Sequence, residues 1–168
     1  MTVRRTREED WADLRALRLA MLLDTPLAFG STYARERDYP ESLWRERAAG
    51  TTWVAHETGA TGDVLPVGLV TLWHAPDQAP DESWLVGMWV APHARGHGVA
   101  DELVGALLEH ARGAGLQRVL LEVAEANARA ARAYSRLGFE PTGESGASRT
   151  HPHICEVTMA HRLSPPAM

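Results

Sequence analysis

The segment Met88–Ala100 reads MWVAPHARGHGVA and predicts a strand, a short loop and the first turn of a helix, in that order. The first turn of a helix has backbone N–H groups without helical partners, and the helix dipole adds partial positive charge there. Glycines in the loop let the backbone close on a bulky anion. We expect Arg95 to order the loop or to attract the anion. We expect a diphosphate to bind the backbone amides of Gly96, His97, Gly98, Val99 and Ala100.

Two other interpretations of this loop stay open. The glycines could simply make a tight turn, or Gly96-x-Gly98 could begin a dinucleotide-binding fingerprint with Glu122 as its acidic residue. Against the fingerprint, Asp101 stands where a third glycine belongs, the loop after Val90 is long, and no second βαβ half remains. A P-loop is excluded because the sequence contains no Gly-Lys-Ser/Thr.

The pattern of apolar residues predicts further strands and helices on both sides of this segment. Toward the N-terminus we expect strands at 2–5, 52–57, 67–73 and 84–90 and helices at 8–23 and 40–49. Toward the C-terminus we expect helices at 98–112 and 128–137 and strands at 118–123 and 154–161. Strands that first form a meander and then alternate with helices predict an α/β fold, with a mixed sheet covered by helices on both faces.

A second distinctive pattern lies at the helix expected over 128–137. Asn127 stands where that helix begins, so it is suited to cap it, to hydrogen-bond a ligand, or to do both. Ala130 and Tyr134 are one helical turn apart and therefore share a face. The small residue leaves room for a flat ligand, above which the tyrosine hydroxyl can lie.

Together, the two segments resemble the acetyl-CoA-binding motifs of the GCN5-related N-acetyltransferases (GNAT). That family's pattern Gln/Arg-x-x-Gly-x-Gly/Ala is met by Arg95, Gly98 and Ala100. Asn127-x-x-Ala130-x-x-x-Tyr134-x-x-x-Gly138-Phe139 matches its second motif, so the resemblance covers residues 88–139. It implies the GNAT fold, a mixed central sheet of about six to seven strands flanked by about four helices. It also implies acetyl-CoA as the acyl donor, a primary amine as the acceptor, and no metal.

The same resemblance assigns residues to the donor. The backbone of Met88, Trp89 and Val90 would pair with the pantetheine arm as if it were an added strand. Further contacts to acetyl-CoA would come from Asn127, Ala130 and Tyr134.

Direct acetyl transfer needs a base to deprotonate the amine and an acid to protonate the leaving thiolate. The motif makes Tyr134 the expected acid. Glu122 matches the glutamate of the ribosomal-protein alanine N-acetyltransferases and is the expected base, while Glu82, His74 or a water stay open as alternatives. The alternative function is a catalytically silent acyl-CoA-binding or sensor domain on the same fold. Tyr134 favours the enzyme, because a binder needs no acid.

The length of 168 residues predicts one domain, placed at 1–163 with a flexible tail at 164–168. A net charge of −5, without a basic stripe, argues against a nucleic-acid partner. The sequence has a single cysteine, no apolar run that could span a membrane and no signal core, so we expect a cytoplasmic protein without a membrane partner. The family resemblance suggests a homodimer. The acceptor, a small molecule or a protein amine, is not readable from the sequence.

Overall fold

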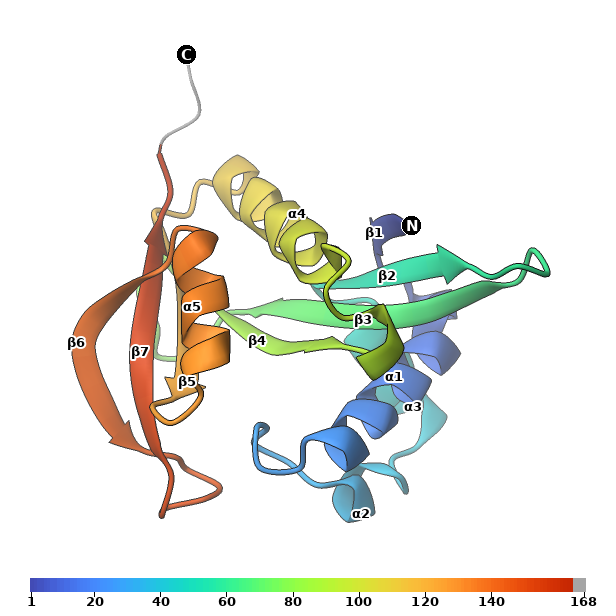
Figure 1. Cartoon of the computed structure of the whole chain (residues 1–168), viewed down its shortest axis with the longest axis horizontal. Coiled ribbons are helices and arrows are strands. Elements are labelled where there is room, and N and C mark those ends of the chain that lie inside the picture. Colours follow the sequence, from blue (N-terminus) through green and yellow to red (C-terminus); the bar gives the residue numbers. More distant parts are fainter. Residues whose placement is uncertain (165–168) are drawn as a thin grey trace. The chain divides into compact units, whose positions relative to one another are not determined.

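The computed structural model describes residues 1–164, which fold into a seven-stranded sheet and five α-helices (Figure 1). The strand order is β1-β2-β3-β4-β5-β7-β6. The sheet is mixed, because β4 and β5 are parallel whereas β1 and β2, β2 and β3, β5 and β7, and β6 and β7 are antiparallel. The predicted α/β fold is therefore confirmed, with one helix more than the four expected. From residue 165 on, the expected tail at 164–168 lies outside the described residues.

The strands are β1 (Thr2–Arg5), β2 (Thr52–Thr58), β3 (Val64–Trp73), β4 (Glu82–Val90), β5 (Arg118–Ala124), β6 (Glu140–Ala147) and β7 (Cys155–Arg162). The α-helices are α1 (Trp11–Asp24), α2 (Tyr33–Glu36), α3 (Glu41–Ala48), α4 (Val99–Gly113) and α5 (Ala128–Arg136). Two short 3₁₀ helices, η1 (Glu8–Asp10) and η2 (Pro92–Ala94), precede α1 and α4.

The chain divides into two compact units, and β4 and α4 each contribute residues to both. The first unit comprises Met1–Leu72 and Gly87–Leu107, and the second comprises Trp73–Val86 and the chain from Leu108 onward. The single domain expected at 1–163 stays a prediction.

In the first unit, α1 and α3 pack together and β2 is covered along most of its length. Leu14, Leu17 and Met21 of α1 are buried at the three- and four-residue spacing that predicted this helix. Trp44 of α3 has only 1% of its surface exposed. Residues 52–56 of β2 are all buried, as expected for a strand with both faces covered.

A buried carboxylate joins three of the helices of the first unit. Glu36, at the end of α2, is 1% exposed and accepts two hydrogen bonds from Arg18 of α1, at 3.0 and 2.8 Å, and one from Arg47 of α3, at 2.9 Å. Burial by itself would raise the pKa of Glu36, but the two guanidinium groups outweigh it and lower the pKa to about 2. The carboxylate is therefore charged at neutral pH and holds α1, α2 and α3 to one another.

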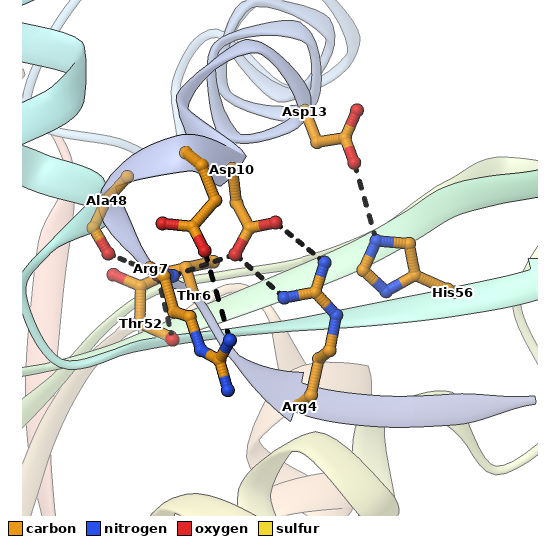
Figure 2. A network of polar contacts seen from close by, with 9 residues as sticks. Arg4, Thr6, Arg7, Asp10, Asp13, Ala48, Thr52 and His56 are labelled. Carbon is orange, nitrogen blue, oxygen red and sulfur yellow. Dashed lines mark hydrogen bonds and ion pairs between the residues drawn. The ribbon is translucent and has the colours of Figure 1, made fainter.

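A second polar network fixes the N-terminal segment (Figure 2). Arg4 of β1 and Asp10 of η1 form two parallel hydrogen bonds of 2.7 Å, and the backbone N–H of Arg7 donates to the same carboxylate at 2.8 Å. The Thr6 hydroxyl donates to the carbonyl of Ala48 at 2.7 Å. These contacts hold the segment between β1 and α1, and residues 4–10, which include Arg4 and Asp10, line a surface hollow together with Ala49.

In the second unit, one aromatic side chain connects α5 to the sheet. Phe139 is 1% exposed and contacts Tyr134 of α5 and His161 of β7 edge-on, with ring centroids 5.7 and 5.3 Å apart. Val119, Leu121 and other apolar residues of β5 are also buried. Phe139 thereby sets the position of α5 on this part of the sheet.

Candidate active site

The predicted phosphate loop is built as a strand, a short turn and a helix, as expected. β4 ends at Val90, η2 follows, and the first α4 hydrogen bond runs from the N–H of Glu102 to the carbonyl of Gly98. The N–H groups of Val99 and Ala100 therefore precede the hydrogen-bond ladder of α4. Gly96 and Gly98 both have φ of +81°, which a residue with a side chain rarely adopts. Residues 95–98 are exposed, so the turn is accessible to a ligand.

Arg95 orders this loop through two anchors within the first unit. Its Nε donates to the carbonyl of Val90 at 2.9 Å, and its Nη2 donates to Oδ2 of Asp24, the last residue of α1. The same Oδ2 accepts a 2.9 Å hydrogen bond from Nε1 of Trp89, whose side chain is buried. Of the two roles predicted for Arg95, the observed contacts fit the ordering role. Asp24 was missed by sequence reasoning, because nothing in the chain marks it apart from its place at a helix end.

The second predicted motif lies on α5, in the second unit. Asn127 caps the helix as expected, because its Oδ1 accepts a 3.1 Å hydrogen bond from the N–H of Ala130. Tyr134 follows Ala130 by one turn, and its ring is partly buried against Phe139. Burial raises the pKa of Tyr134 to about 12, so its hydroxyl keeps its proton through neutral pH and is available as a donor.

Glu122, the predicted base, lies on β5 with its side chain exposed, whereas its neighbours Leu121 and Val123 are buried. This alternation is the one that the sequence predicted. In the ladder between β5 and β7, Glu122 pairs with Thr158 and Ala124 with Glu156, so Glu122 and Glu156 are diagonal neighbours on one face. Desolvation and the charge of Glu156 raise the pKa of Glu122, and the charge of Arg149 opposes them. Glu156 was not singled out in the sequence, because only the strand register brings it beside Glu122.

The other two side chains considered for the base, also in the second unit, already have partners. The carboxylate of Glu82 forms an ion pair with Arg118, with a 2.7 Å hydrogen bond from Nε. His74 Nδ1 lies 2.9 Å from the backbone carbonyl of Glu82. The assignment of Glu122 as the base stays a prediction.

Comparison with known proteins identifies the family. The family model described as "Acetyltransferase (GNAT) family" matches residues 11–139, which is most of the chain. The chain belongs to the GNAT acetyltransferase family. It is therefore an N-acetyltransferase, and acetyl-CoA is the donor in this family. The predicted family, enzyme class and donor are thereby confirmed.

Solved structures share the fold. The structure of yncA from Salmonella typhimurium with its cofactor acetyl-CoA has a TM-score of 0.76 and 21% identity, over 100% of this chain and 96% of that one. The ribosomal-protein-alanine N-acetyltransferase from Brucella melitensis has a TM-score of 0.72 and 21% identity, over 97% of this chain and 100% of that one. Nourseothricin acetyltransferase has a TM-score of 0.56 and 29% identity, over 67% of this chain and 65% of that one. A comparison of the sequence with curated proteins gives no significant match.

Two features of residues 1–164 bear on metals and membranes. Within residues 1–164, no group of three or more His, Cys, Asp or Glu side chains is arranged to hold a metal ion. Among the helices of the same residues, none combines the length and the apolar character that a membrane span requires.

Proposed function

We propose that this acetyltransferase binds acetyl-CoA through the loop at 95–100 and transfers the acetyl group to a primary amine of a small molecule or a protein. The observation that carries the proposal is the loop itself. Two turn glycines, Gly96 and Gly98, have φ of +81° and precede the first turn of α4, where backbone N–H groups favour an anion. The amides of residues 96–100 would bind the diphosphate, and Arg95 would keep the loop in this conformation.

Other residues would contact the rest of the donor. The backbone of Met88, Trp89 and Val90 would pair with the pantetheine arm, because the end of β4 offers strand-like N–H and C=O groups. From the second unit, the donor contacts would come from Asn127, Ala130 and Tyr134. The Oδ1 of Asn127 already caps α5, so its amide N–H₂ is the group left to bind a ligand.

In the chemical step, the amine nitrogen attacks the thioester carbon, an oxyanion forms, and the C–S bond breaks to release the CoA thiolate. Glu122, directly or through a water, would accept the proton that the amine loses. Its raised pKa supports this role, because a base works best when its pKa is near the working pH. Tyr134 would give its proton to the thiolate, and its pKa of about 12 keeps that proton in place until the thiolate forms.

The acceptor has to be found by experiment, since one fold serves many acceptors. The names of two similar structures illustrate the range, one being a ribosomal-protein-alanine N-acetyltransferase and the other a nourseothricin acetyltransferase. A peptide with N-terminal alanine, a lysine-containing peptide, a polyamine and an amino-sugar antibiotic therefore form a suitable panel. The cytoplasmic location and the homodimer stay predictions, and sedimentation of the purified protein would test the second.

The first test is a calorimetric titration with acetyl-CoA and, separately, with NAD. Saturable binding of acetyl-CoA alone supports the proposal, whereas binding of NAD in its place would favour the dinucleotide interpretation. Thiol release is then measured with each amine of the panel. All 17 basic Lys and Arg residues of this chain are arginines, so acetylation of its own lysine side chains cannot contribute to the signal. Binding without turnover on any amine is the result expected of a silent acyl-CoA-binding domain.

A further inference from the structure

Asp24 occupies an unfavourable position for a carboxylate. It is the last residue of α1, and the C-terminal end of a helix carries partial negative charge that disfavours an acid there. Two donors from a distant part of the sequence compensate for this, namely the indole of Trp89 and the guanidinium of Arg95. Their hydrogen bonds lower the pKa of Asp24, the Trp89 bond contributing most, so the side chain is charged at neutral pH.

Both of these hydrogen-bond donors, Trp89 and Arg95, belong to the segment that carries the phosphate loop. Trp89 is the penultimate residue of β4, and Arg95 immediately precedes Gly96. Beyond Arg95, the residues from Gly96 to Gly98 are exposed, and the two glycines have no side chain to hold them. Arg95 is therefore the anchor next to the exposed turn, and Asp24 and the Val90 carbonyl hold this anchor.

We propose that Asp24 is a positioning residue for acetyl-CoA binding, which acts through Arg95 and Trp89 by holding the end of β4 and the phosphate loop in the conformation that binds the diphosphate. The inference rests on the proposed function, in which this loop binds acetyl-CoA. Because these contacts exist in the free protein, they reduce the ordering cost that the loop would otherwise incur on binding. In this scheme Asp24 itself contacts neither acetyl-CoA nor the amine substrate.

The assignment gives α1, which ends at Asp24, a role in acetyl-CoA binding. With Nε and Nη2 donating to Val90 and Asp24, the guanidinium of Arg95 is held in one orientation and its charge is paired with Asp24. Its contribution to affinity should then depend on Asp24. A side chain that contacted phosphate directly would contribute independently of Asp24.

The test is a double-mutant cycle on acetyl-CoA affinity, measured by calorimetry with the full chain. Asp24→Asn keeps an oxygen that can accept from the Trp89 indole but removes the charge that holds Arg95, and Arg95→Met removes the guanidinium. We expect each single variant to weaken acetyl-CoA binding about three- to ten-fold. The double variant should have the same affinity as the single variant that binds more weakly. Asp38→Asn is the matched control, since Asp38 forms an exposed pair with the adjacent Arg37 and its replacement should leave affinity unchanged.

A second readout follows the contact without any ligand. The Nε1–H resonance of Trp89, assigned as the indole signal that Trp89→Phe removes, should shift in Asp24→Asn and not in Asp38→Asn. If wild-type protein does not bind acetyl-CoA, the proposed function fails. If wild-type protein binds and Asp24→Asn binds equally well, or if the losses of the two single variants add in the double variant, only the positioning role of Asp24 is overturned. An unchanged Trp89 resonance in Asp24→Asn would overturn it as well.

Discussion

Replacing Glu36 with glutamine should reveal how strongly the buried carboxylate holds the helices of the first unit together. The side chain is 1% exposed and accepts three charge-assisted hydrogen bonds of 2.8 to 3.0 Å from Arg18 and Arg47. Glutamine has nearly the same shape but no charge, and its N–H₂ group faces a guanidinium donor. The pKa of Glu36 falls from 4.5 to about 2, a difference that corresponds to about 3 kcal/mol of stability at neutral pH. Removing one partner of a buried ion pair typically costs a similar amount.

The contribution of Glu36 to stability should also depend on pH in a definite direction. Because the folded-state pKa of Glu36 is lowered, its contribution is complete above the unfolded value of 4.5 and is lost as the pH falls toward 2. The difference in unfolding free energy between wild type and Glu36→Gln should therefore shrink from about 3 kcal/mol at pH 7 to about 1.5 kcal/mol at pH 3.

The assay is urea unfolding at pH 7 and pH 3, supported by thermal midpoints, which should fall by about 6–12 °C at pH 7. Glu41→Gln is the control, because Glu41 forms an exposed pair with Arg45 one turn along α3 and should change stability by less than about 0.5 kcal/mol. A Glu36→Gln variant within 1 kcal/mol of this control at pH 7, or a difference that grows on acidification, would show that the buried carboxylate does not have this role.

Three further predictions concern the active site. Tyr134→Phe and Glu122→Gln should each lower kcat about tenfold or more with an identified acceptor, while Tyr39→Phe should not; if neither does, the acid and base assignments are wrong. Glu156→Gln should move the acidic limb of the kcat/KM profile to lower pH, because it removes a charge that raises the pKa of Glu122. If the limb does not move, it does not report the titration of Glu122. Gly98→Ala should weaken acetyl-CoA binding about tenfold, because φ of +81° costs alanine about 1–2 kcal/mol, and equal affinity in Gly98→Ala and wild type would contradict the loop geometry.

The elements with strong periodicity could be predicted from the sequence, and the missed ones lack it. The apolar spacing in α1 and α4 and the buried run in β2 gave these elements nearly at their observed bounds. β6 reads EPTGESGA, all of its residues are exposed, and it contains a proline and a register shift between Pro141 and Ser145, so no hydrophobic alternation reveals it. The alternation of Cys155 with Val157 and Met159 favours a core position for it, but Cys155 is exposed at the first residue of β7.

In the candidate site, too, residues with a local role could be predicted and residues with a long-range role could not. Its glycines and the capping Asn127 could be predicted, because their chemistry depends on local backbone geometry. Asp24 and Glu156 could not, because each acquires its role from a residue distant in the sequence: Arg95 is 71 positions from Asp24, and the register of β5 and β7 brings Glu156 beside Glu122.

The one-turn helix α2 shows why such long-range contacts also decide local structure. Four residues are far too few for a helix to be stable by propensity, and the hydroxyl of Thr32, which accepts from the N–H of Arg35, offsets only a small part of the nucleation cost. What holds this turn in place is Glu36 at its end, which is fixed by arginines of α1 and α3. The ion pair thus specifies the turn rather than the reverse. It follows that Glu36→Gln should release the segment between α1 and α3 to faster hydrogen exchange while leaving the exchange of β5 and β7 unchanged.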